Sequence, residues 1–363
     1  MSRLTVRCHQ VSGILHTPFV TALRRTTTTD SLLVEVRDTD GVSGLGEVPQ
    51  IWQVTGESLP GARACVEGPL GAVLADADPE DLHATLDRVG LAVVGNHGAK
   101  AAIDVALHDL LARRRDLPLT RLLGGLTTAV PTDVTVSAGD PDALAATAAS
   151  RIAAGFAVLK LKVGTDAASD VTGVLAVRRA VGPDVVIRVD ANQGWTPRAA
   201  VRAISTLEDA AADLQLVEQP VPAQDIDGLA WVSDRVATPV AADESVFGVR
   251  DLVRVIERRA ADVVNVKLAK AGGLRPARTL LELARAHDMG TMVGSMMETH
   301  VGVGAAASLV AALGTTVTSD LDAAWWLAEP VTAGGLTYTD GHVLLPDAAG
   351  LGISLLDRSS AVS

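Results

Sequence analysis

Five charged residues recur at nearly regular intervals through the middle of the chain, and their types suggest metal-assisted proton transfer. They are Lys162, Asp190, Glu218, Asp243 and Lys267, separated by 28, 28, 25 and 24 residues. Each stands at or just beyond the end of a short apolar segment. One such residue alone could begin a solvated loop or form half of a salt bridge. Five at this spacing favour one shared site.

The three acidic residues of this set predict a metal ion. Carboxylates that converge repel one another, so a cation is expected among Asp190, Glu218 and Asp243. Oxygen ligands alone favour Mg²⁺, with Mn²⁺ as the alternative.

Two lysines flank the acidic residues, one before and one after them in the chain. A lysine near a metal or other cations can have a lowered pKa and act as a general base. Lys162 and Lys267 are therefore candidates for acid/base catalysis from opposite faces of a substrate carbon. Lys160 should point to the same side of its strand as Lys162. A Schiff base between a lysine and a carbonyl compound is possible, but it would leave the three carboxylates without a role.

Eight β-branched segments, alternating with Ala-rich helical segments, must position these residues. They span residues 134–136, 157–163, 185–190, 214–218, 239–243, 262–267, 291–294 and 317–321. Strands that alternate with helices indicate a parallel sheet, and eight such units fit a closed α/β barrel. Active sites of barrels lie at the carboxyl ends of the strands. The five charged residues should therefore meet at one mouth.

The chain before and after this region does not show this alternation of strands and helices. The N-terminal part reads as three strands and then three helices, at 4–16, 31–37, 43–47, 57–75, 79–89 and 98–115. The glycine-rich stretch 41–46 is interpreted as a turn, because its spacing does not fit a dinucleotide-binding loop. We expect an α+β domain over 1–125, the barrel over 126–330, and a C-terminal segment, 331–363, that returns to the first domain.

Composition excludes several classes of function. The chain has 363 residues, of which 48% are hydrophobic and 20% charged, so a large core is expected. Its 31 basic and 43 acidic residues give a net charge of −12, which disfavours binding to nucleic acid or an anionic membrane. Two cysteines cannot form a disulfide framework, and no apolar run is typical of a signal peptide or a membrane span. We expect a cytoplasmic protein.

The motifs around the five charged residues resemble those of the enolase superfamily, in its muconate-lactonising-enzyme subgroup. The motifs are Lys160-Leu161-Lys162, Asp190-Ala191-Asn192, Val217-Glu218-Gln219-Pro220, Asp243-Glu244-Ser245 and Lys267. The resemblance implies a modified (β/α)₇β TIM-like barrel with an α+β capping domain. It also implies Mg²⁺ on the three acidic residues, Lys162 and Lys267 as the acid/base pair, and Lys160 on the substrate carboxylate. The family is commonly oligomeric, so a homo-oligomer is expected.

Within the subgroup the chain most resembles dipeptide epimerases of the L-Ala-D/L-Glu type. The features are Thr21-Ala22-Leu23-Arg24, Thr135-Val136-Ser137, Gly294-Ser295-Met296-Met297-Glu298-Thr299 and Asp320-Leu321-Asp322. The resemblance implies that Arg24 binds a side-chain carboxylate and that Asp320 and Asp322 bind the dipeptide's ammonium. Thr135 would line the pocket. The expected reaction is two-base 1,1-proton transfer at the C-terminal residue's α-carbon, through an ene-diolate.

Alternative reactions use the same lysines and metal. A muconate-type cycloisomerase, an o-succinylbenzoate synthase or an N-acylamino-acid racemase would have no ammonium for Asp320 and Asp322 to bind. A sugar-acid dehydratase would want a histidine where Lys267 stands, and a non-catalytic binding protein would have lost some of the five residues.

Three tryptophans leave the preferred dipeptide open. Trp325 and Trp326 follow the two aspartates, where the family usually has smaller residues, and Trp52 lies in a second capping loop. They could narrow the pocket or pack beneath the capping domain. Glu298 and His300 receive no role from the sequence.

Overall fold

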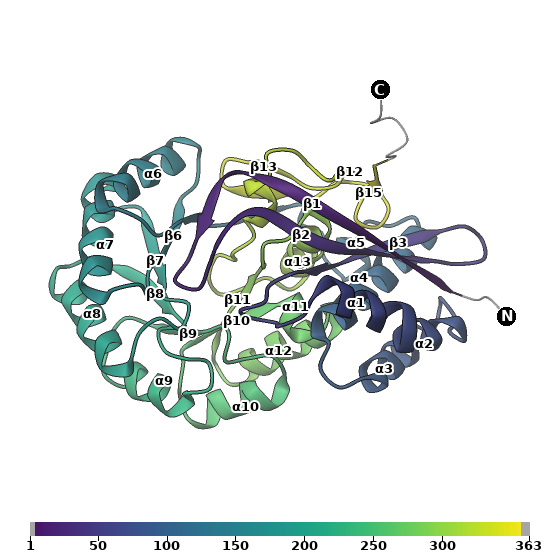
Figure 1. Cartoon of the computed structure of the whole chain (residues 1–363), viewed down its shortest axis with the longest axis horizontal. Coiled ribbons are helices and arrows are strands. Elements are labelled where there is room, and N and C mark those ends of the chain that lie inside the picture. The colour runs from purple at the N-terminus through teal and green to yellow at the C-terminus, as the bar shows by residue number, and fades with distance from the viewer. Residues whose placement is uncertain (1–3, 357–363) are drawn as a thin grey trace.

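A computed structural model describes residues 4–356 and shows a curled parallel sheet beside a smaller α+β unit (Figure 1). The seven parallel strands run in the order β11-β10-β9-β8-β7-β6-β5. The helices that follow the strands lie outside the sheet (Figure 1). The predicted fold class, a modified TIM-like barrel with an α+β cap, is confirmed.

The barrel strands agree closely with the predicted segments, with one exception. The strands are β5 (Val134–Val136), β6 (Val158–Lys162), β7 (Val186–Asp190), β8 (Leu214–Glu218), β9 (Val240–Ala242), β10 (Val263–Lys267) and β11 (Gly290–Gly294). The eighth segment, 317–321, forms no ladder. It instead makes isolated bridges from Ser319 to Thr132 and from Asp320 to Gly294. It thus lies between the two edges of the sheet, and these bridges bring Asp320 to the barrel mouth.

Several barrel helices begin with side-chain caps that the sequence supplies. Asp140, Asp166 and Thr196 each accept a hydrogen bond from a backbone amide in the first turn of a helix. The helices are α6 (Pro141–Ala153), α7 (Ala167–Val181), α8 (Pro197–Asp209), α9 (Ile226–Ser233), α10 (Val249–Glu257), α11 (Leu268–Ala271), α12 (Leu274–Ala286), α13 (His300–Leu313) and the 3₁₀ turn η2 (Ala323–Trp326). No helix in the described part of the chain is long and apolar enough to cross a membrane.

The capping unit is an antiparallel sheet packed on helices. Its strands β1 (Thr5–Val20), β2 (Arg25–Arg37) and β3 (Ser43–Pro49) pair in sequence order. Its helices are α1 (Leu59–Cys65), the π-helical η1 (Val66–Leu70), α2 (Gly71–Ala75), α3 (Leu82–Ala92), α4 (His97–Arg114) and α5 (Leu119–Leu122). The helical pattern predicted over 57–75 corresponds to α1, η1 and α2, but the chain is kinked at Gly68, just before Pro69, and does not form one straight helix.

The prediction of a turn over residues 41–46 was only partly right. Gly41 is in the turn, with φ of +87°, but Gly44 and Gly46 belong to β3. A Cβ atom on Gly46 would lie 1.9 Å from the carbonyl oxygen of Ala102 in α4. Glycine is therefore required there by close packing of a strand on a helix.

The β1–β2 hairpin reaches the barrel mouth. Its turn is closed by a hydrogen bond from the Thr21 amide to the Arg24 carbonyl, at 2.9 Å. Beside the turn, the Ala138 amide donates to the carbonyl of Val20, at 3.2 Å. The hairpin thus holds Arg24 over the carboxyl end of β5.

The C-terminal segment contacts both the barrel and the cap. Its strands are β12 (Thr332–Gly334), β13 (Thr337–Thr339), β14 (His342–Leu344) and β15 (Ile353–Leu355); β14 pairs with β4 (Ala129–Pro131) and β12 with β15. Arg113 of α4 donates to the carbonyl of Ile353. The domain boundaries near residues 125 and 330 stay predictions, and residues 1–3 and 357–363 of the predicted outer segments lie outside the described residues.

Candidate active site

The five charged residues of the sequence pattern gather at the carboxyl ends of neighbouring strands. In the parallel ladders, Lys162 is the register partner of Asp190, and Asp190 is the partner of Glu218. Asp243 follows β9 and Lys267 ends β10. All five side chains are buried.

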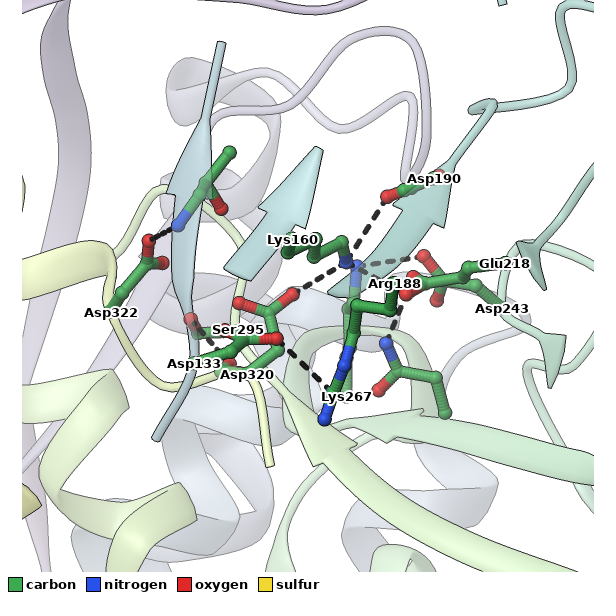
Figure 2. A network of polar contacts seen from close by, with 12 residues as sticks. Asp133, Lys160, Arg188, Asp190, Glu218, Asp243, Lys267, Ser295, Asp320 and Asp322 are labelled. Atoms are coloured by element: carbon green, nitrogen blue, oxygen red, sulfur yellow. Dashed lines mark hydrogen bonds and ion pairs between the residues drawn. The ribbon is translucent and has the colours of Figure 1, made fainter. Parts of the chain in front are cut away.

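Lys160 lies at the centre of an acidic cluster rather than in the open cavity. Its Nζ is 2.7 Å from Asp320 Oδ2, 2.8 Å from Glu218 Oε2 and 3.1 Å from Asp190 Oδ2. Figure 2 shows this ammonium pointing in among the carboxylates. Burial alone would lower the pKa of Lys160, but the surrounding carboxylates raise it well above its usual value. Lys160 is therefore a buried cation.

The other lysines each pair with one metal-ligand candidate. Lys162 Nζ donates to Asp190 Oδ2 at 2.6 Å, and Lys267 Nζ donates to Asp243 Oδ2 at 2.7 Å. Burial would lower the pKa of Lys267, but Asp243 raises it. Burial would raise the pKa of Asp190 and of Asp243, but nearby lysines, chiefly Lys160 for Asp190 and Lys267 for Asp243, hold both below the usual range.

The three carboxylates have the chemistry of a Mg²⁺ site. They supply oxygen ligands from consecutive strands, and they already attract an ammonium ion into their midst. As the side chains lie, no group of three or more His, Cys, Asp or Glu within residues 4–356 surrounds a single metal position. In this arrangement Lys160 is shared by Asp190 and Glu218, while Asp243 pairs with Lys267. The residues fit a metal that takes over the role of Lys160 as the shared cation.

A cavity opens above this cluster, between the hairpin and the strand ends. Its lining includes six residues that the sequence singled out: Arg24, Thr135, Lys162, Lys267, Asp320 and Asp322. Lys160 and the three acidic residues lie beneath it. Apolar side chains from the cap and from the loop after β11, among them Phe19, Ile51 and Met297, complete the wall.

Asp322 presents one free oxygen to this cavity. Its Oδ2 accepts hydrogen bonds from the Thr135 amide at 2.7 Å and from the Trp326 indole at 2.9 Å. Among the described residues, no donor reaches Oδ1. Burial and the charge of Asp320 raise the pKa of Asp322 to about 6. Asp320, which pairs with Lys160, has its pKa lowered.

Arg24 supplies an unpaired positive charge at the opposite, capping side. It lines the cavity from the hairpin turn, and none of the acidic groups in the described chain pairs with it. Burial lowers the pKa of its guanidinium to about 10. The side chain is thus positioned to bind an anion that enters the cavity.

The tryptophans do not line the cavity. Trp326 is buried behind Asp322, and Trp325 packs against Trp326 edge to face. Trp52 has 56% of its surface exposed, although its neighbours Ile51 and Gln53 line the pocket. The possibility that these rings narrow the pocket is not supported.

Two residues that hold the acidic cluster were not predicted from the sequence. Lys270 Nζ lies 2.6 Å from Asp243 Oδ1, and Asn265 donates to Glu218 Oε1 at 3.0 Å. Period-two alternation could have found Asn265, because it precedes Lys267 by two residues on β10 and faces the same side. Lys270 had no such signal, because it lies on the helix that follows.

Comparisons with known proteins agree with this geometry. Residues 3–124 match the model of the mandelate racemase / muconate lactonizing enzyme N-terminal domain, and residues 143–359 match the enolase C-terminal domain-like family. The chain is 39% identical to the L-Ala-D/L-Glu epimerase of Bacillus subtilis, over 97% of both chains. A structure of a substrate-liganded complex of that enzyme superposes with a TM-score of 0.94, covering 97% of this chain and 99% of the other.

A second relative is named for a different substrate from that of the Bacillus subtilis enzyme. The hydrophobic dipeptide epimerase of Enterococcus faecalis is 38% identical over 93% of this chain and 95% of its own. A structure of the dipeptide epimerase from that organism, complexed with Mg and L-Leu-L-Tyr, superposes with a TM-score of 0.93 over 97% of this chain and 99% of the other. The two domain matches and these full-length relatives place the chain in the mandelate racemase / muconate lactonizing enzyme family of the enolase superfamily.

Proposed function

We propose that the chain is an isomerase that epimerises dipeptides at the α-carbon of the C-terminal residue, by two-base 1,1-proton transfer. The observation that carries the proposal is that Lys162 and Lys267 line the same cavity as Asp322 and Arg24. The relatives named above, which are dipeptide epimerases, support the same reaction.

The two lysines are placed to serve opposite faces of one carbon. They end strands β6 and β10, which are separated by three strands around the curved sheet. Each could therefore approach a substrate in the cavity from its own side. One lysine would take the α-proton while the other returns a proton to the opposite face, which inverts the centre.

Asp190, Glu218 and Asp243 would hold Mg²⁺, or Mn²⁺ in its place. The bound ion would stabilise the negative charge that moves onto the substrate carboxylate when the α-proton leaves. Lys160, a buried cation beside the same carboxylates, would add to that stabilisation.

The polar groups of the cavity suit the two ends of a dipeptide. The free oxygen of Asp322, with Asp320 close by, suits an ammonium. Arg24 suits a second carboxylate and favours an acidic C-terminal side chain such as that of Glu. The apolar wall of Phe19, Ile51 and Met297 supports a hydrophobic side chain as the second candidate.

Removing each lysine separately tests the two-base assignment. In D₂O with Mg²⁺ and L-Ala-L-Glu or L-Ala-D-Glu, we expect K162A and K267A each to exchange the α-proton of one epimer only. The two variants should select opposite epimers, and neither should interconvert them. Proton NMR measures both properties. Epimerisation by either variant at more than a few per cent of the wild-type rate would contradict the assignment. Arginine at the same positions is the matched control, because it keeps the charge but cannot act as a base.

Three further parts of the proposal rest on the sequence and on the family resemblance. They are a cytoplasmic location, a homo-oligomeric assembly and the absence of a nucleic-acid or membrane partner. Gel filtration with light scattering tests the assembly.

A further inference from the structure

Trp326 lies directly behind the carboxylate that faces the cavity. Its indole Nε1 donates to Asp322 Oδ2 at 2.9 Å, and the ring itself is 2% exposed and absent from the cavity wall. The Thr135 amide donates to the same oxygen at 2.7 Å. Two donors thus hold Oδ2, and Oδ1 is left for a ligand.

The indole is itself held in place by rings from other parts of the chain. His16 of β1 stacks on it, with ring centroids 5.3 Å apart and planes 11° apart. Phe19 meets it edge to face at 5.1 Å, and the guanidinium of Arg151 in α6 lies 5.4 Å from its centroid. The ring is therefore packed between the cap and the barrel and cannot swing away from Asp322.

We propose that Trp326 is a positioning residue that selects substrates with a free ammonium group. The indole and the Thr135 amide together bind one oxygen of Asp322, so the carboxylate cannot rotate and Oδ1 stays directed at the cavity. An ammonium gains a charge-assisted hydrogen bond to an oxygen that needs no reorganisation. A neutral acyl group at the same place gains nothing. This inference rests on the proposed function, because it takes a dipeptide as the ligand.

The test compares W326F with W325F on two matched ligands. Phenylalanine keeps an aromatic ring at position 326 but lacks the N–H group. Trp325 belongs to the same cluster, with ring centroids 5.8 Å from Trp326, but makes no hydrogen bond to Asp322 through its indole, so W325F is the matched control. The ligands are L-Ala-L-Glu and N-propionyl-L-Glu, which lacks only the ammonium. KM, or Ki where a ligand is not turned over, is measured for both.

We expect W326F to raise KM for L-Ala-L-Glu about tenfold, the effect of one hydrogen bond to a charged group. Its kcat should stay within about twofold of wild type. The constant for N-propionyl-L-Glu should change less than about twofold, and W325F should change neither ligand's constant. In a D322N background, W326F should add no further loss, because the indole acts through Asp322.

Several outcomes would overturn the inference. Equal losses for both ligands would assign Trp326 a purely structural role, and no loss for either would remove its role altogether. Additive losses in the D322N background would show that it does not act through Asp322. If wild-type protein epimerises no dipeptide, the proposed function fails and this inference falls with it. If wild type is active but W326F behaves like W325F, only the inference fails.

Discussion

Asp322 holds a proton more tightly than an exposed aspartate does, because burial and Asp320 raise its pKa to about 6. Below that pH the carboxyl is neutral and no longer attracts an ammonium. We expect KM for L-Ala-L-Glu to rise as pH falls from 7 to 5, while KM stays level above about pH 7. Asp320 should not add to this change, because its pKa is lowered.

Steady-state kinetics over that pH range measure the effect. The D322N variant is the control: its KM should be high at every pH, without the rise seen in wild type. A wild-type KM that does not change between pH 5 and 7 would contradict the assignment of Asp322 to the ammonium.

Arg24 should decide the preference for an acidic side chain. In R24M the cavity loses its unpaired cation, so we expect kcat/KM for L-Ala-L-Glu to fall about 10- to 100-fold. The value for L-Ala-L-Leu should stay level or rise. Arg25, its exposed neighbour at the start of β2, gives the matched control R25M, which should change neither. Equal effects of R24M on both dipeptides would show that Arg24 does not bind the side chain of the C-terminal residue.

The sequence could predict which residues meet at the barrel mouth, but not their pairing. The strand–helix units have nearly the same length, so one strand end occurs in each unit. This spacing was enough to predict that five residues meet at the mouth: Lys162, Asp190, Glu218, Asp243 and Lys267. The distances depend on side-chain rotamers, which spacing does not determine. Lys160 therefore proved to lie inside the acidic cluster, and the second partner of Asp243, Lys270, was missed.

At the scale of elements, close packing of β3 on α4 depends on glycine. A Cβ at Gly46 would meet backbone atoms of Ala102, which cannot move aside. We expect G46A to lower the free energy of unfolding by at least about 3 kcal/mol. In contrast, Gly90 in α3 has open space around it, so G90A should raise stability by about 0.5–1 kcal/mol.

Urea unfolding followed by circular dichroism measures both variants. A G46A protein as stable as wild type would show that β3 and α4 can move apart without loss of stability. Sequence patterning could not anticipate this contact, because a glycine in a strand and a glycine in a turn look the same until the partner element is known. The eighth barrel segment is a similar case: its β-branched residues predict a strand, but it forms only bridges.

At the scale of the whole molecule, a buried carboxylate joins the cap to the barrel. Glu47 of β3 accepts hydrogen bonds from the amides of Thr299 and Gly302, at the start of α13, and from the hydroxyl of Thr299. Negative charge at a helix N-terminus is favourable. This contact fixes the loop after β11, which forms one wall of the cavity.

Glu298, beside this contact, should make stability depend on pH. Burial and the nearby Glu47 raise its pKa to about 8. The folded protein therefore keeps a proton that the unfolded chain releases above about pH 4.5. Stability should fall as pH rises from about 4.5 to 8 and level off above that. Near pH 8 the effect should be on the order of a few kcal/mol.

The E298Q variant isolates this effect. Glutamine has nearly the same shape and no charge, so thermal melts in EDTA should show E298Q gaining stability over wild type between pH 5 and 8.5. The comparison removes the contributions of groups that do not interact with Glu298, because those groups titrate alike in both proteins. A difference between the two proteins that does not change with pH would contradict a raised pKa at Glu298.

The central claim is proton transfer at the α-carbon of a dipeptide's C-terminal residue. The most direct measurement is proton NMR of wild-type protein in D₂O with Mg²⁺ and L-Ala-L-Glu, L-Ala-D-Glu or L-Ala-L-Leu. We predict that the C-terminal α-proton is replaced by deuterium while the other epimer appears, fastest with the Glu dipeptides, and that the N-terminal α-proton is retained. The absence of exchange on every dipeptide, with Mg²⁺ shown to be bound, would contradict the claim and favour a cycloisomerase or an acylamino-acid racemase.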